Sequence, residues 1–342
     1  MRAFKSGTIS KAISIAGIAL TGFVTQSLPL QAQTQPAAAA KSSVVRHVTQ
    51  GLGKMVAENL FECAEKVASF RKTPVGTITA TDGTIITLPA ESAYQKGLRG
   101  GADLHNDCTK TDPKTLAEVE ALTAKTPIVE IDPDGEVITG YMMGDNYYEM
   151  YVNEKLVAVD SVPYTPMNGS IVRFKVKRPY TIAMKLVDWE ENLGVASELN
   201  RANKWHPGDG GLIARFSDGT VTDSTWRAQS FYVGPLANPD DVIEKRGNVH
   251  DTTKLGRTHP LANMPTCQDK CFGVHYDIPA TWQSRTFDDK SWPRANEFTD
   301  EEIGVNAMVA YTRFPELFDD ARWIWSMNLV YDNVVIVRKT VR

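Results

Sequence analysis

The stretch of the chain best suited to chemistry is Asp188-Trp189-Glu190-Glu191-Asn192. It places one indole beside three carboxylates and an amide, directly after a β-rich run. A sugar suits such a stretch, because its axial hydrogens stack on an aromatic plane while its hydroxyls need fixed donors and acceptors. We therefore predict a carbohydrate-binding site formed by Asp188, Trp189, Glu190, Glu191 and Asn192.

A second stretch of the same character, Lys204–Gly211, carries Trp205 and Asp209 on a glycine-rich loop. Loops next to strands commonly carry binding residues, so we predict Trp205 as the opposite wall of the site and Asp209 as part of its polar rim. The structural alternative is that Trp189 packs under the edge of a sheet and the carboxylates are simply solvated. The acids could also hold Ca²⁺, which prefers oxygen ligands.

The spacing of these acids does not favour catalysis. Hydrolysis of a glycosidic bond needs an acid and a base or nucleophile at a defined separation. Glu190 and Glu191 are adjacent and would point to opposite faces of a strand. The chain also has no Gly-x-Ser-x-Gly elbow, phosphate-binding loop or dinucleotide fingerprint. We expect binding without catalysis.

Asp103, His105 and Asp107 form another candidate ligand set. They alternate along the chain, so an extended backbone would point all three side chains the same way. Polar loops carry such trios by chance, and we do not predict a metal there.

The four cysteines are an even number, which favours two disulfides in an exported protein. The economical pairing joins Cys63 to Cys108 and Cys267 to Cys271, although three pairings are possible. A zinc site is the alternative. Its ligands would be Cys267, Cys271, His275 and His259. An oxidising compartment argues against it, because it would consume the thiols that zinc needs.

The beginning of the chain has the features of a targeting segment. Three basic residues, Arg2, Lys5 and Lys11, precede an apolar run, Ala12–Val24, which is too short for the roughly twenty residues of a membrane helix. We predict a signal peptide at 1–32, a linker at 33–41, and a periplasmic or secreted protein. Removing residues 1–32 changes the net charge from -4 to 34 minus 41, or -7, and duplex nucleic acid is then not an expected partner. No later stretch is apolar enough to span a membrane.

Residues 42–126 are predicted to form a small α/β extension. Apolar residues at three- and four-residue spacing predict an amphipathic helix over Ser43–Arg71. Val75–Ala80 and Thr84–Leu88 flank Thr81-Asp82-Gly83 and predict a hairpin.

From residue 127 to 342 short β-rich runs alternate with turn residues, which predicts an antiparallel sandwich. The hairpin Asp145–Ala158 is central to it, with aromatic residues on both faces of its first strand. Further strands are predicted at 128–131, 137–141, 172–176, 182–187, 211–216, 230–233, 308–312, 323–326 and 333–339. The segment 234–279 is predicted to be a long irregular insertion.

Several motifs in this part resemble those of the galactose-binding-like module that precedes the catalytic domain in bacterial α-L-rhamnosidases. The matching segments are Asp145–Ala158, Asp218–Arg227, Phe287–Pro293, Ala321–Trp325 and Val334–Arg338. The resemblance implies a mainly β fold, an antiparallel jelly-roll sandwich, in which Asp288, Asp289 and Trp292 fix a turn and fill the core. The catalytic barrel of those enzymes has no counterpart here.

Together these features predict an exported, non-catalytic carbohydrate-binding or cell-surface recognition protein whose partner is an oligosaccharide or polysaccharide. A glycan-acting enzyme and a structural envelope protein are the alternatives.

Overall fold

A computed structural model describes residues 45–59, 73–90, 101–162, 168–199, 205–255 and 269–342, without the side chains of Leu199 and Trp205. The described residues belong to one compact unit, Ser42–Arg342. The predicted signal peptide and linker lie outside the described residues. Among the helices of the described part, none is long and apolar enough to cross a membrane.

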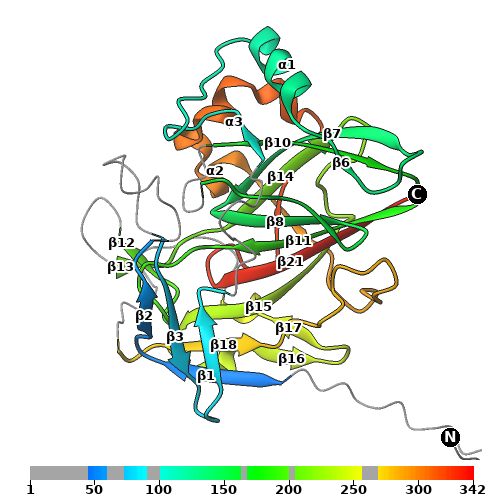
Figure 1. The fold of residues 1–342 in the computed structure, drawn as a ribbon. Helices are drawn as coiled ribbons and strands as arrows, with labels where there is room; N and C mark the ends of the chain where they lie inside the picture. Colours follow the sequence, from blue (N-terminus) through cyan, green and yellow to red (C-terminus); the bar gives the residue numbers. More distant parts are fainter. Residues whose placement is uncertain (1–44, 60–72, 91–100, 163–167, 200–204, 256–268) are drawn as a thin grey trace, which may run out of the picture. The chain divides into compact units, whose positions relative to one another are not determined.

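The first of two large sheets has seven antiparallel strands and contains the central hairpin (Figure 1). In spatial order these are β1 (Arg46–Gln50), β18 (Phe272–Tyr276), β15 (Arg227–Leu236), β21 (Asp332–Val341), β11 (Tyr180–Val187), β8 (Tyr147–Val152) and β9 (Lys155–Val159).

The second large sheet also has seven strands. Its order is β19 (Asn296–Phe298), β20 (Trp323–Trp325), β14 (Gly211–Phe216), β7 (Glu136–Asp145), β10 (Ser170–Val176) and β5 (Ala102–Asp103), with β6 (Val129–Glu130) parallel to β10. The protein is therefore mainly β, with antiparallel sheets, as the sequence predicted.

Three small sheets and short helices complete the described structure. The small sheets comprise β2 (Lys54–Ala57), β3 (Val75–Thr79) and β4 (Ile85–Leu88), then β12 (Glu198–Leu199) with β13 (Trp205–His206), then β16 (Ile243–Lys245) with β17 (Val249–Asp251). The helices are α1 (Leu116–Lys125), α2 (Asp300–Ile303), α3 (Val309–Arg313) and the 3₁₀ turns η2 (Pro239–Asp241), η3 (Thr253–Leu255), η4 (Val305–Ala307) and η5 (Pro315–Phe318).

The hairpin β8–β9 confirms the prediction for Asp145–Ala158. Asn153 and Glu154 form its turn with positive φ angles of 47° and 71°, the geometry that two-residue hairpin loops require. Met150 packs in the core shared by the two large sheets, whereas Tyr147 packs in a separate core on the opposite face. Both faces of β8 are thus buried, which explains the aromatic and apolar residues on each.

The second core lies on the face of the first sheet that points away from the other large sheet. Ile78 of β3 and Leu88 of β4 contribute to it, together with three tryptophans, Trp189, Trp282 and Trp292. The predicted hairpin at 75–88 is therefore confirmed, and it covers this face. The prediction that Trp292 fills the core is also confirmed, since only 5% of Trp292 is exposed.

The predicted helix over Ser43–Arg71 is wrong wherever the chain is described, because that part forms β1 and β2. β1 pairs with β18, and His47 and Thr49 alternate with half-buried neighbours. The β-branched residues around Val48 suit a strand, and Gly51, with φ of 75°, turns the chain afterwards. Residues 60–71 of the prediction lie outside the described residues.

Two further expectations need correction. The predicted strand at 308–312 is largely the short helix α3. The predicted irregular insertion at 234–279 contains β16, β17 and β18, and β18 is an interior strand of the first sheet. Two strands from the predicted 42–126 region, β1 and β5, also join the large sheets.

Candidate functional site

Trp189 does not reach a surface where a ligand could stack on it. Only 1% of Trp189 is exposed. Its Nε1 donates a hydrogen bond to Pro74 O at 3.0 Å, and its ring packs edge to face against Tyr147 with 5.5 Å between the ring centroids. The prediction that Trp189 is a sugar-stacking platform is therefore wrong, and the structural alternative holds for this residue.

The remaining residues of the predicted site are mostly buried as well. Asn192 is 5% exposed, whereas Glu191 and Asp209 are half-buried. Trp205 lies in β13, where its backbone pairs with Leu199 of β12, and its side chain is outside the described structure.

Glu190 holds its own loop together. Its carboxylate accepts hydrogen bonds from Gly194 N at 3.0 Å, from Ala196 N, and from Tyr232 Oη at 3.0 and 3.1 Å. The prediction that this carboxylate forms an open binding rim is wrong, because these donors surround it and only 2% of the residue is exposed.

Asp188 lies among other carboxylates at the same edge of the sheets. Burial, and after it the carboxylates of Glu198, Asp145 and Asp209, raises the pKa of Asp188 well above its ordinary value. Its Oδ2 has no hydrogen-bond partner among the described residues. Asp188 is therefore within electrostatic reach of Asp209, Asp145 and Glu198, and its own carboxyl group is buried.

The buried carboxyl of Glu190 gives a first testable prediction. Burial raises the pKa of Glu190 from 4.5 to about 7, against the lowering effect of its hydrogen-bond donors, which include Gly194 N, Ala196 N and Tyr232 Oη. Because the folded pKa is raised, the stability that Glu190 contributes is complete below pH 4.5 and is lost as the pH rises towards 7. A neutral Glu190→Gln variant lacks this dependence. Wild type should therefore lose about 3 kcal/mol relative to Glu190→Gln between pH 4.5 and pH 8.

Urea denaturation of both proteins at pH 4.5, 6 and 8 measures this difference. A difference that stays constant across the three pH values would contradict the assignment of a raised pKa to Glu190.

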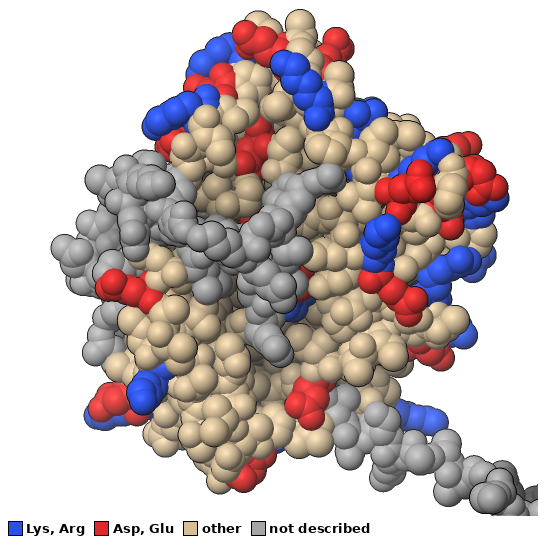
Figure 2. All heavy atoms as spheres, in the orientation of Figure 1, with Lys and Arg blue, Asp and Glu red and all other residues tan. Residues whose placement is uncertain are grey.

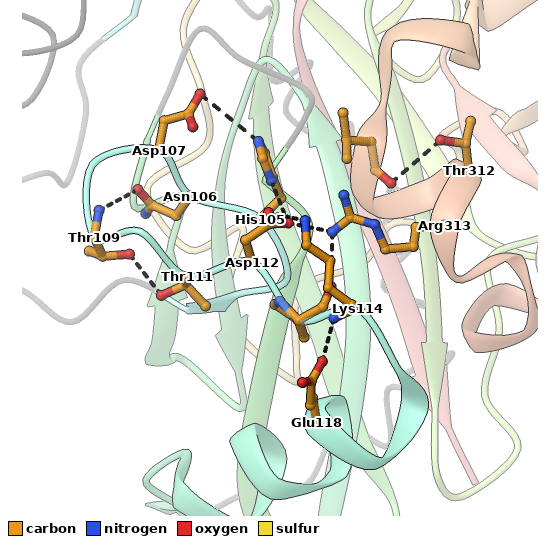
Figure 3. A network of polar contacts seen from close by, with 12 residues as sticks. His105, Asn106, Asp107, Thr109, Thr111, Asp112, Lys114, Glu118, Thr312 and Arg313 are labelled. Carbon is orange, nitrogen blue, oxygen red and sulfur yellow. Dashed lines mark hydrogen bonds and ion pairs between the residues drawn. The ribbon is translucent and has the colours of Figure 1, made fainter.

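Asp103, His105 and Asp107 do not converge. Asp103 is buried and accepts hydrogen bonds from Ser161 Oγ at 2.6 Å and from Asn168. The imidazole of His105 points instead to Asp107 and Asp112 in a half-buried polar network (Figure 3).

That network joins the loop before α1 to α3. The carboxylate of Asp112 lies 3.2 Å from Nδ1 of His105 and also forms ion pairs with Lys114 and Arg313. Figure 3 shows these three side chains around it. The hydrogen bonds from Lys114 and Arg313 lower the pKa of Asp112 below its usual range. The arrangement attaches a loop to a helix.

The cysteine predictions remain predictions, because Cys63 and Cys267 lie outside the described residues. Cys271 is buried at the start of β18, and His275 of that strand contacts Thr49 Oγ1 through Nε2 at 3.1 Å. Burial lowers the pKa of His275 to about 3. In the described part of the chain, no group of three His, Cys, Asp or Glu side chains is arranged to hold a metal.

A cleft of about 680 Å³ lies elsewhere, between the start of β15, the segment 285–294 and the end of β21. Phe287 supplies an aromatic ring to its wall, and Thr225, Thr286 and Thr340 supply hydroxyls. The lining also includes Asp288 and Asp289 and seven basic residues. The basic residues are Arg227, Arg285, Lys290, Arg294, Arg338, Lys339 and Arg342.

Arg338 fixes one wall of this cleft. It is 1% exposed, its Nε donates to Asp289 Oδ2 at 2.8 Å, and its guanidinium also donates to Trp282 O and to Ser284 O. Its Cζ lies 5.0 Å from the centre of the Phe287 ring. The loop that follows β18, gold in Figure 1, is thereby attached to β21. The prediction that Asp289 fixes a turn fits these contacts.

The basic residues of the cleft were not predicted as site residues. A signal was present, since Arg285 and Arg294 flank the Phe287–Pro293 motif, Lys290 lies within it, and the sequence ends in Arg-Lys-Thr-Val-Arg. What the sequence does not show is that these two segments face one another.

The charge of the cleft differs from that of the protein as a whole. The chain has 37 basic and 41 acidic residues. On the face shown in Figure 2, Lys and Arg atoms lie interspersed with Asp and Glu atoms along the upper and right edges. Seven basic against two acidic side chains in one cleft give a local excess of five positive charges.

Comparison with known proteins finds no relative of this chain. No family model, no curated protein and no solved structure matches the chain.

Proposed function

We propose that the protein is an exported, non-catalytic recognition protein that binds a carbohydrate polymer in the cleft between β15, the 285–294 segment and β21. We also propose that its two large sheets form a jelly-roll sandwich of the galactose-binding-like class. The order of its motifs, from the central hairpin to the Trp323–Trp325 strand, supports this class.

The cleft is the observation that carries the proposed function. Its volume of about 680 Å³ is in the range of sites that enclose a ligand of several rings. It combines the half-buried ring of Phe287 with hydroxyl and charged groups, which are the kinds of group that a sugar needs.

The two carboxylates of the cleft are engaged in local structure, which favours binding over hydrolysis. Asp289 binds Arg338, and Asp288 accepts a hydrogen bond from Lys290 N at 3.2 Å. A glycosidase needs one acid and one base or nucleophile facing across the scissile bond. The proposal therefore assigns these acids to shaping the loop.

A glycan array probed with the mature protein tests the proposal, followed by calorimetric titration with the glycans that bind. Thr340→Trp fills the cleft from an exposed position on β21 and should weaken binding at least tenfold. Thr79→Trp, an exposed strand position on β3, is the matched control and should bind like wild type.

Binding to no carbohydrate would refute the proposed function, and equal binding by Thr340→Trp would refute its location. Repeating the titration with a chelator tests the alternative that the acids at Asp188–Asn192 and Asp209 hold Ca²⁺.

A further inference from the structure

Three arginines of the cleft stand in a row across neighbouring segments of the first sheet. Arg227 of β15 is paired in register with Arg338 of β21, and on its other side it forms an isolated bridge with Arg294. Residues paired in this way across antiparallel strands present their side chains on the same face. Adjacent members of the row are therefore about 5 Å apart at the backbone.

Like charges placed directly opposite one another on a sheet repel and are destabilising. One of the three, Arg338, is neutralised by Asp289. Arg227 and Arg294 donate only to main-chain carbonyls among the described residues, at 2.9 Å to Trp292 O and 3.1 Å to Thr225 O. Their positive charges thus remain uncompensated by any described carboxylate.

Arg285 adds a further positive charge to the lining of the cleft. It is exposed, and it has no ion-pair or hydrogen-bond partner among the described residues. In contrast, Lys290 lies 3.8 Å from Asp288, and Lys339 lies 4.0 Å from Asp223. The four other basic residues of the cleft, Arg227, Arg285, Arg294 and Arg342, therefore form no ion pair with a described carboxylate, and the first three lie on the loop and strand that build its walls.

We infer that the ligand of this cleft is a polyanionic polysaccharide, with sulfate or carboxylate groups that pair with Arg227, Arg285 and Arg294. The inference rests on the proposed function and names its ligand class. Guanidinium groups bind planar and tetrahedral oxyanions through paired N–H donors, and a ligand with repeated anionic groups would relieve the repulsion within the row. A single small anion would leave most of a 680 Å³ cleft empty.

A polysaccharide is favoured over nucleic acid by the rest of the molecule. The chain has 37 basic and 41 acidic residues, so a long duplex running beyond the cleft would meet a surface of mixed charge with a small acidic excess. A flexible glycan needs contact only along the cleft itself.

Calorimetric titration of the mature protein with four polymers tests the inference. They are a sulfated polysaccharide, its desulfated neutral parent, a polyuronate and duplex DNA. At least one of the two charged polysaccharides should bind about tenfold or more tighter than the neutral parent. Its affinity should also fall about tenfold or more between 50 and 200 mM salt, because binding releases counterions. The sulfated and uronate arms separate the two sources of negative charge.

Substitutions locate the effect. The double variant Arg285→Gln, Arg294→Gln should weaken binding of the charged polysaccharide more than tenfold, at an unchanged melting temperature. Arg322→Gln, which removes an exposed arginine that does not line the cleft, should bind like wild type.

Equal, salt-independent binding of the neutral parent would overturn the inference and leave the proposed function intact. Tighter binding of DNA than of either charged polysaccharide would also overturn it, as would wild-type affinity in the double variant. If none of the carbohydrates bind, the proposed function fails together with the inference.

Discussion

Replacing Trp189 with alanine is expected to lower the free energy of unfolding by about 3–5 kcal/mol, because a large buried aromatic side chain is removed and a cavity remains. The indole is 1% exposed, packs edge to face on Tyr147 and donates to Pro74 O at 3.0 Å. The loss combines apolar burial, the ring contact and a buried carbonyl left without its donor.

Urea denaturation followed by circular dichroism measures this loss. Trp189→Phe is the informative control, since it keeps a ring against Tyr147 but lacks the Nε1 donor, and it should lose clearly less stability than the alanine variant. A Trp189→Ala protein that unfolds at the wild-type urea concentration but no longer binds carbohydrate would instead restore Trp189 to a binding role.

The strands of the large sheets could be predicted because their own residues carry the information. In β8, Tyr147 begins the set of side chains on one face of the strand and Tyr148 begins the set on the other. With Asn153 at the following turn, this local pattern indicates a hairpin without reference to the rest of the fold. The antiparallel, mainly β class follows from many such runs.

The errors arose where partners distant in the sequence decide the outcome. The residues around Val48 fit a helical spacing, yet they pair with β18, more than 200 positions away. Residues 308–312 look like a strand, but Met308 and Ala310 are buried beside η5 as part of a short helical segment, α3. A periodic pattern alone does not reveal which surface will cover it.

The candidate site shows the same limit more strongly. Asp188 to Asn192 were correctly recognised as an unusual concentration of polar groups beside an indole, but nothing in the stretch shows that the hairpin β3–β4 covers it. The cleft is built from Arg227, Arg285–Arg294 and Arg338, three segments that approach one another only through the strand order of the first sheet.

The second large effect concerns a buried ion pair in the central hairpin. Glu149 of β8 is paired in register with Lys185 of β11, and Lys185 Nζ lies 2.8 Å from Glu149 Oε1. Only 9% of the lysine side chain and 2% of the glutamate side chain are exposed. Tyr147 and Tyr151 also donate to the glutamate, at 3.3 and 3.2 Å. The pair therefore lies in the interior, among aromatic rings.

Lys185→Met should cost about 3–5 kcal/mol, because it takes the ammonium group of Lys185 away from the buried carboxylate of Glu149 while a side chain of similar length fills the space. The double variant Glu149→Gln, Lys185→Met should recover at least half of that loss, since the amide oxygen still accepts from the two tyrosines and no charge is left inside. Urea denaturation of the two variants and wild type at pH 7 measures the stability lost in Lys185→Met and the part of it recovered in the double variant. A double variant less stable than Lys185→Met would contradict this explanation of the stability lost in Lys185→Met. The hydrogen bonds of Glu149 with Tyr147 and Tyr151 would then contribute more to stability than its ion pair with Lys185.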